Sequence, residues 1–214
     1  MPRKVRVRSP STWRREAIRQ MERSRAATLA FLRRLPAEEI VRPQTQGQWS
    51  IQDVLAHIAA WEEEGTRRLA LIARGHADRM IFYDDMPAVD RFNARAVVAA
   101  GAMPLPGLLR RLARVRQRLI AALRKLPLRA LNDSSHELPV VVWLREFAWT
   151  HERAHRREIR EWWMNRRAEL DTRGRARTVP AQRLSQHSAP KGTGRRSRDE
   201  GSGPRGRDQR ARSE

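Results

Sequence analysis

The sequence contains no cysteine, a single tyrosine and no long apolar run. Without cysteine the chain can form neither disulfides nor thiolate metal sites, and a catalytic cysteine is excluded as well. Any bound metal must therefore be held by histidine and carboxylate side chains. Because no segment approaches the roughly 18 to 20 consecutive apolar residues of a membrane span, we expect no insertion into a membrane.

Acidic residues are few compared with basic ones. The chain has 24 Asp and Glu against 45 Lys and Arg, which gives a net charge of +21. Such a charge predicts attraction to polyanions. The arginines are spread over every outward helix face and no nucleic-acid recognition motif occurs, so we expect non-specific nucleic-acid binding through the basic C-terminal tail as an accessory property.

Composition divides the chain into a central folded region and two tails. Residues 171–214 are rich in Gly, Ser, Pro and Arg, and residues 1–10 are similar. Such segments cannot bury enough apolar surface to offset the entropy of ordering, so both tails are predicted to be disordered. Residues 11–170 remain as one domain. No apolar signal-peptide core follows the Arg-rich start, so we expect a cytoplasmic protein, with an organelle transit peptide as the alternative.

The periodicity of the central region is helical, with no alternation typical of a strand. Four long helices are predicted, over residues 12–35, 50–75, 105–126 and 139–167. A short helix is expected over residues 86–98, between the second and third long helices. This pattern predicts an all-α fold, a four-helix bundle with one extra short helix.

Two histidines lie on the apolar stripe of the fourth helix. A helical wheel with Leu144 at zero places His151, His155 and Glu158 within about 60° of the stripe's centre. Histidines at i and i+4 lie one above the other and can close on one metal ion. His57 lies beside the apolar stripe of the second helix. Three imidazoles therefore converge if these two helices face each other.

Two other interpretations stay open at this point. The histidines could be core residues satisfied by nearby carboxylates or backbone groups. Residues 151–155 also read HERAH, a match to the H-E-x-x-H signature of zinc proteases. We disfavour a peptidase, because Glu158 and Glu161 stand where the extended motif has glycine and histidine and an all-helical chain offers no edge strand for a peptide. Glu152 is expected to pair with Arg156 instead.

Three segments carry a resemblance to a known family. The segment GQWSIQDVLAHIAAWEE resembles the second-helix signature of the DinB/YfiT-like superfamily, and VDRFNARAV and THERAHRREIREWW resemble later segments of its ClbS/DfsB-like branch. The similarity covers about residues 11–165. It implies a four-helix bundle, often dimeric, with a metal ion held by one histidine of the second helix and two of the last.

These ligand positions correspond to His57, His151 and His155, so we predict a site for a divalent metal: zinc, nickel or iron. Three imidazoles leave an open coordination position, which is typical of catalytic rather than structural sites. Glu158 is the candidate catalytic residue, either as a fourth ligand or as a base beside the ligands. Asp53, one turn before His57, is a candidate to orient that imidazole.

The resemblance leaves the reaction open, since members of the superfamily include thiol transferases, a thiol-dependent isomerase and hydrolytic resistance proteins. We expect a hydrolase or thiol transferase that acts on a small, electrophilic substrate, with a low-molecular-weight thiol as a candidate partner, in a homodimer. Trp61 and Trp162 are candidates to line the ligand pocket. The alternative is a metal-free interaction bundle or a nucleic-acid-binding helical bundle.

Overall fold

A computed structural model describes residues 9–81, 83, 85–101, 103–133 and 138–178, and of residues 174–178 only the backbone. Across these residues the secondary structure is helical and contains no β-strand, which confirms the predicted all-α fold. None of the described helices is long and apolar enough to cross a membrane.

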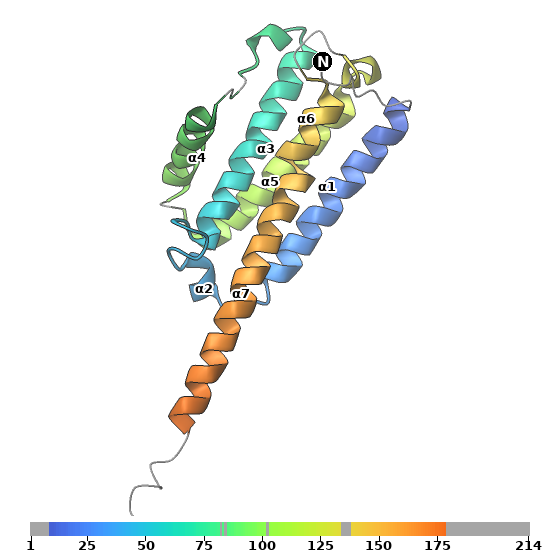
Figure 1. Cartoon of the computed structure of the whole chain (residues 1–214). Helices are drawn as coiled ribbons and strands as arrows, with labels where there is room; N and C mark the ends of the chain where they lie inside the picture. Colours follow the sequence, from blue (N-terminus) through green and yellow to red (C-terminus); the bar gives the residue numbers. More distant parts are fainter. Residues whose placement is uncertain (1–8, 82, 84, 102, 134–137, 179–214) are drawn as a thin grey trace, which may run out of the picture. The chain divides into compact units, whose positions relative to one another are not determined.

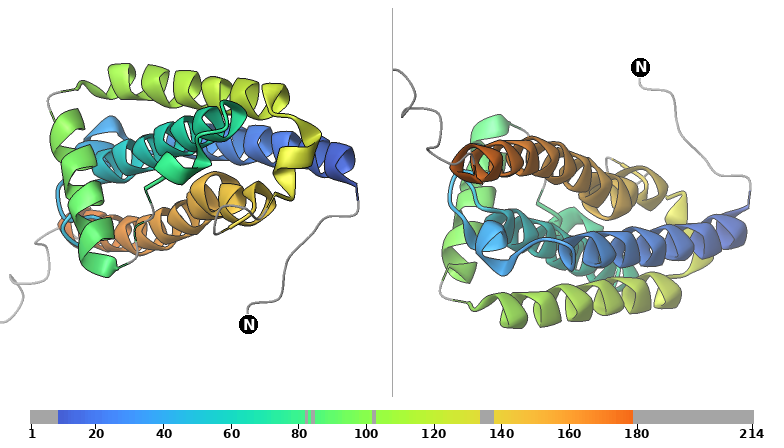
Figure 2. Two further views of the ribbon diagram at one scale, coloured as in Figure 1. Left: turned by 90° about the horizontal axis from the view of Figure 1, so that it is seen from above. Right: turned by 90° about the horizontal axis from the view of Figure 1, so that it is seen from below.

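The bundle is built from long helical segments that run side by side (Figure 1, Figure 2). They are α1 (Pro10–Leu32), α3 (Ile51–Ala73), α5 (Leu105–Lys125) and a divided last segment, α6 (Val140–Phe147) and α7 (Trp149–Thr178). These segments correspond to the four predicted long helices.

Shorter elements connect and flank the bundle. The predicted extra helix is α4 (Met86–Ala100), which lies along the outside of α3 (Figure 1). Its N-terminus is capped by Asp85, whose Oδ1 accepts the Ala88 N–H at 2.6 Å. The remaining elements are α2 (Ala37–Val41) and two 3₁₀ turns, η1 (Ala77–Arg79) and η2 (Leu128–Leu131).

The start of α3 is set by a capping box. The Ser50 hydroxyl accepts the Asp53 N–H at 3.0 Å, and the Asp53 carboxylate accepts the Ser50 N–H at 2.9 Å. Two backbone donors that the helix itself cannot satisfy are thus paired. The cap holds the first turn of α3 in place, and His57 follows one turn after Asp53.

The last helix differs from its prediction. It is interrupted at Ala148, where φ is −118° and ψ is −100°. No proline or glycine marks this position. The break accompanies tertiary packing, because Ala148 is fully buried and the Phe147 ring stacks on Trp61 at 4.9 Å. Local sequence alone therefore does not signal it.

The ends of the folded region also differ from expectation. The helix α1 begins at Pro10, and α7 continues through Thr178, into the segment predicted to be disordered from Asp171 onward. Arginine, alanine and glutamate favour helix, and a helix already nucleated by packing extends at little cost. The rest of the two predicted tails, residues 1–8 and 179–214, lies outside the described residues.

The apolar core forms two clusters separated by a layer of buried charge. One cluster gathers side chains such as Leu55, Leu108 and Ile159, and the other gathers side chains such as Met21 and Leu144. On each long helix a charged residue lies between the members of the two clusters. These residues are Arg25 on α1, Glu62 on α3, Arg116 on α5 and Glu152 on α7. We call them the charge tetrad.

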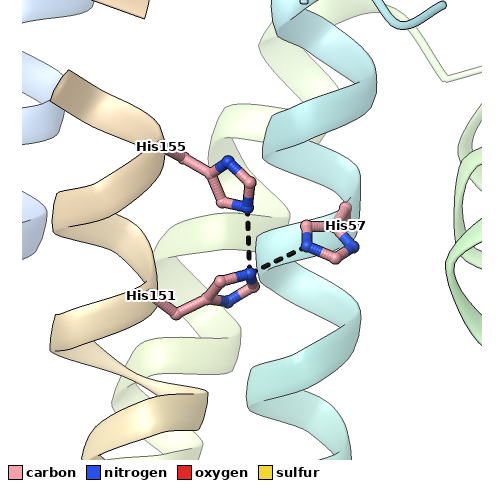
Figure 3. A group of neighbouring side chains, drawn as sticks. All are labelled: His57, His151 and His155. Atoms are coloured by element: carbon pink, nitrogen blue, oxygen red, sulfur yellow. Dashed lines mark hydrogen bonds between the residues drawn. The ribbon is translucent and has the colours of Figure 1, made fainter. Parts of the chain in front are cut away.

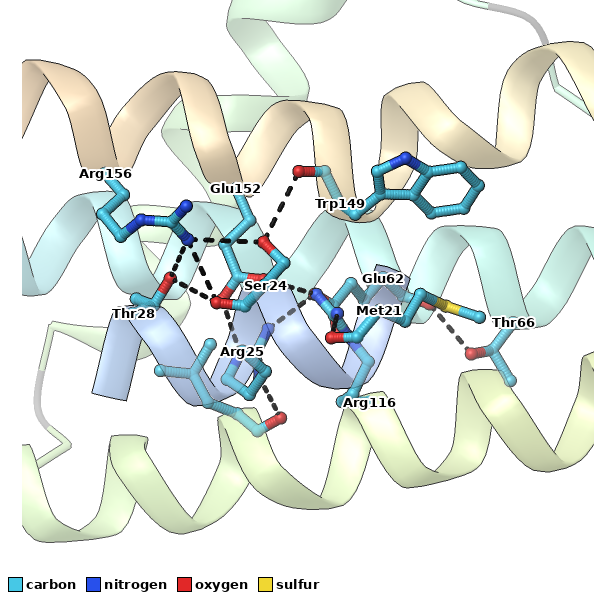
Figure 4. A network of polar contacts seen from close by, with 11 residues as sticks. Met21, Ser24, Arg25, Thr28, Glu62, Thr66, Arg116, Trp149, Glu152 and Arg156 are labelled. Atoms are coloured by element: carbon cyan, nitrogen blue, oxygen red, sulfur yellow. Dashed lines mark hydrogen bonds and ion pairs between the residues drawn. The ribbon is translucent and has the colours of Figure 1, made fainter. Parts of the chain in front are cut away.

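The charge tetrad pairs two guanidiniums with two carboxylates at the centre of the bundle (Figure 4). Arg25 lies 2.6 Å from Glu62 and 2.6 Å from Glu152. Arg116 lies 2.9 Å from Glu152, and its Nε donates to Glu62 at 3.1 Å. The two guanidiniums also donate to the backbone carbonyls of Leu112 and Met21.

The charges of the tetrad cancel, which makes their burial tolerable. Glu62 and Glu152 are only 0% and 1% exposed. Burial by itself would raise the pKa of Glu152, but the guanidiniums of Arg25 and Arg116 outweigh this effect and the pKa is lowered. The two guanidiniums and two carboxylates of the tetrad sum to no net charge, and their ion pairs connect one residue of each long helix to the others.

Replacing Glu62 with glutamine is expected to lower the free energy of unfolding by about 3 to 5 kcal/mol, because two buried guanidiniums would share one carboxylate. Urea denaturation measures this loss. The matched control is Glu63→Gln on the exposed side of the same helix, which breaks a surface pair with Arg111 and should cost under about 1 kcal/mol. Equal losses in the two variants would show that the tetrad does not stabilise the bundle.

Candidate metal centre

The three predicted ligand residues meet inside the bundle (Figure 3). His57 lies on α3 and is buried, and the Trp49 ring packs against it at a centroid distance of 5.1 Å. His151 and His155 lie one turn apart on α7 and are half-buried. The two helices face each other here, as the convergence of the three imidazoles requires.

The Nε2 atoms of the three rings point at one another. Nε2 of His151 lies 2.8 Å from Nε2 of His57 and 3.0 Å from Nε2 of His155. The three rings thus form a cluster that could hold a metal ion, with one nitrogen from each ring and all three nitrogens within 4.8 Å of one another.

Protons alone cannot satisfy this arrangement. Nδ1 of His155 lies 2.8 Å from the Glu158 carboxylate and therefore carries a proton, which leaves a lone pair on the Nε2 of neutral His155. Nε2 of His151 contacts two other ring nitrogens but can hold at most one proton. At least one of the two contacts then lacks a well-placed hydrogen. A cation that accepts all three lone pairs removes this conflict.

Burial keeps two of the imidazoles neutral. Desolvation, together with repulsion from His155, lowers the pKa of His57 from 6.5 to about 4, although Asn93 acts in the opposite direction. Desolvation and the two neighbouring imidazoles lower the pKa of His151 to about 3. Neutral imidazole is the form that binds metal, so the site is ready for an ion at neutral pH.

Two of the nitrogen separations are somewhat shorter than in a tetrahedral zinc centre. Two nitrogens about 2.1 Å from a zinc ion, at a tetrahedral angle, lie about 3.4 Å apart. The observed spacings of 2.8 and 3.0 Å require the rings to move outward by a few tenths of an ångström. An all-imidazole donor set suits zinc, nickel or iron and does not suit magnesium or calcium, which prefer oxygen ligands.

A pocket of about 450 Å³ opens beside His155. Its walls include Trp49, Trp162 and Glu158. A loop closes one side, and Gly47 adopts a φ of +64° in it, a conformation that glycine accepts without strain. The pocket gives a small molecule access to the edge of the histidine cluster.

The two predicted pocket tryptophans have different roles. Trp162 lines the pocket beside His155, as expected. Trp61 is instead buried behind the cluster, where its ring contacts His57 and His151 edge-on and its indole N–H donates to Asn93. It supports the imidazoles and is absent from the pocket wall.

Asp53 and Glu158, the two residues predicted to assist the histidines, have different contacts in the structure. Asp53 remains in the capping box, and Nδ1 of His57 meets no hydrogen-bond partner among the described residues, so Asp53 does not orient this ring. Glu158 contacts His155 on the nitrogen that faces away from the cluster and is half exposed toward the pocket. In this arrangement it hydrogen-bonds His155 and adds no oxygen to the cluster.

The expected pairing of Glu152 with Arg156 is wrong. Glu152 forms its ion pairs with Arg25 and Arg116, whereas Arg156 donates to the carbonyl of Ser24 and the hydroxyl of Thr28. Both carboxylate oxygens of the glutamate in HERAH are therefore held in the bundle interior. A general base of the zinc-protease type would need one of them free.

Sequence reasoning missed the charge tetrad and the aromatic support of the histidines. Charged residues on the inward faces of neighbouring helices were the available signal for the tetrad. Trp49 belongs to the segment that carries the family resemblance, but its contact with His57 could not be predicted, because it depends on the turn of the loop before α3.

The described residues thus form an all-helical bundle in which three imidazoles from facing helices make a candidate metal centre. Residues 20–159 match the family model of the DinB superfamily, and the chain belongs to this superfamily. All three histidines lie within the matched residues. The match names no branch of the superfamily, and neither a curated protein nor a solved structure matches the chain.

The lowered pKa values of His57 and His151 predict how the metal-free protein responds to acid. Unfolded histidines take up protons near pH 6.5, whereas these folded ones do so only near pH 4 and pH 3. Between about pH 7 and pH 5, the free energy of unfolding should therefore fall by about 2 kcal/mol per buried histidine. Urea denaturation in the presence of a chelator measures this slope.

The control for this slope is the exposed His76. The variant His76→Ala should keep the wild-type pH dependence, whereas His151→Ala should lose part of it. An identical slope in the wild type and both variants would contradict the neutral, buried state of the cluster.

Proposed function

We propose that the protein is a metal-dependent enzyme of the DinB-like type. In this proposal it activates water or a thiol against a small electrophilic substrate, as a hydrolase or thiol transferase. One observation carries the proposal: three imidazole Nε2 atoms converge beside a pocket, and burial keeps two of these imidazoles neutral. A buried cluster of this kind is costly without an ion and leaves a coordination position open with one.

The proposed chemistry divides between the ion and the chain. A divalent ion held by three neutral imidazoles supplies Lewis acidity that lowers the pKa of a coordinated water or thiol toward neutrality. Glu158 holds the proton on Nδ1 of His155, which fixes the tautomer and raises the basicity of Nε2. Because its carboxylate also borders the pocket, Glu158 takes up a proton released by the nucleophile through one bridging water.

The pocket supports a small substrate. Its volume of about 450 Å³ suits a molecule of low molecular weight, and the Trp49 and Trp162 rings offer apolar surface next to the polar side chains of Thr45 and Gln46. A low-molecular-weight thiol as co-substrate and a homodimeric assembly stay predictions from the family resemblance.

Metal content is the first test. Protein produced without a histidine tag should contain about one equivalent of zinc, nickel or iron by mass spectrometry, and the double variant His151→Ala, His155→Ala should contain none while keeping its helical spectrum. The control His76→Ala removes an exposed histidine and should keep the metal.

A metal-free native protein, even after reconstitution with each ion, would contradict the proposal. It would favour the alternative of an interaction bundle, in which replacing His57, His151 or His155 changes stability alone.

The variant Glu158→Gln separates the two roles of this residue. The amide oxygen of the new side chain can still accept the His155 Nδ1–H, but the amide cannot take up a proton. The metal should therefore stay bound while turnover falls by about 10²- to 10⁴-fold. Hydrolysis of p-nitrophenyl acetate, and displacement of chloride from 1-chloro-2,4-dinitrobenzene by a thiol, supply the assays.

The control for this variant is Glu161→Gln, which changes an exposed carboxylate on the same helix outside the pocket lining. Equal turnover in the two variants would contradict a role of Glu158 as the proton acceptor.

A further inference from the structure

The helix α5 carries charge of one sign. Between Leu105 and Lys125 it contains arginines and a lysine but no aspartate or glutamate, whereas α1, α3 and α7 each carry both signs. Seven basic residues thus lie on α5 with no carboxylate among them.

Part of this charge is used by the fold. Arg116 belongs to the charge tetrad, Arg111 pairs with Glu63 at 2.8 Å, and Arg124 lies 3.9 Å from Glu22. The other basic side chains of α5 are exposed and form no ion pair with any described residue. They are Arg110, Arg114, Arg118 and Lys125, and we call them the α5 basic face.

The four residues share one side of the helix. At 100° per residue they fall within about 80° of one another, opposite the buried stripe of Leu112, Leu119 and Leu123. At 1.5 Å per residue they extend over about 22 Å. This length matches about six phosphates on one strand of a duplex at 3.4 Å per phosphate along the axis.

The residue types on the α5 basic face indicate which kind of polyanion it suits: a single strand, a membrane surface or a duplex. The other exposed residues between Arg110 and Lys125 are Ala113, Gln117, Ala121 and Arg124, so the face presents no aromatic ring and no large apolar side chain. Stacking on single-stranded bases needs aromatic rings, and insertion into a membrane surface needs Trp, Phe or Leu. A duplex needs neither, because its phosphates are reached by long cationic side chains alone.

We propose that the α5 basic face binds the phosphate backbone of double-stranded nucleic acid without sequence preference. Guanidinium groups suit this role, since each can donate two parallel hydrogen bonds to a phosphate. The two views in Figure 2 place α5 and α7 on opposite sides of the bundle, so a duplex on α5 leaves the pocket beside His155 open. The inference does not depend on the proposed enzymatic function.

The test uses the full chain and a duplex of random sequence labelled with a fluorophore. Fluorescence anisotropy measures binding at about 50 to 200 mM salt, and the variant Arg110→Gln, Arg114→Gln, Arg118→Gln should bind at least about tenfold more weakly at about 100 mM. The slope of log K against log salt should become shallower by about 3, one unit per lost phosphate contact.

The matched control removes the same charge from another helix end. The variant Arg23→Gln, Arg33→Gln, Arg34→Gln replaces exposed arginines that form no ion pair with a described residue, and its salt slope should stay within about one unit of the wild type. Both variants keep residues 179–214, so any contribution of that segment is constant. Unchanged thermal melting confirms that both fold.

Several outcomes would overturn the proposal. Equal weakening in both variants would mean that net charge, not this face, drives binding. No weakening in either, or no duplex binding by the wild type at about 100 mM salt, would exclude the face as a duplex site. Binding to phosphatidylserine vesicles that depends on the α5 arginines, with no binding to the duplex, would assign the face to a membrane surface instead.

Discussion

The charge tetrad at the centre of the bundle constrains the rest of the structure. Each long helix contributes one buried charge, and the two carboxylates can meet the two guanidiniums only when the helices keep a single register. Glu152 is the direct neighbour of His151 on α7, and Glu62 lies little more than one turn after His57 on α3. The register that pairs the charges therefore also brings His57 and His151 together, at 2.8 Å.

Buried carboxylates and buried imidazoles in the bundle have opposite charge states. The carboxylate of Glu152 stays ionised because two guanidiniums outweigh the cost of burial, whereas His57 and His151 stay neutral because no opposite charge among the described residues compensates their burial. In the segment HERAH of α7, the glutamate therefore belongs to the charge tetrad and the two histidines belong to the candidate metal centre. The residues of this protease-like motif thus take part in two different sets of contacts in the fold.

Much of the site could be predicted from helical periodicity and from the family resemblance. The positions of His151 and His155 on one face follow from their spacing, and the contribution of His57 follows from bundle geometry. The contact between Glu158 and His155 could be anticipated as neighbours on one helix face. The partners of Glu152 could not, because a wheel shows which neighbours on the same helix are available and says nothing about Arg25 or Arg116.

Local sequence determined the helices, their apolar stripes, the capping box of α3 and the absence of any cysteine-based chemistry, since each depends on residues within a turn or two of one another. Tertiary structure decided the interruption at Ala148, the partners of the buried charges and the pocket between Trp49 and Trp162. These features join residues far apart in the chain. Their energies come from burial and pairing across helices, which no local pattern of residues encodes.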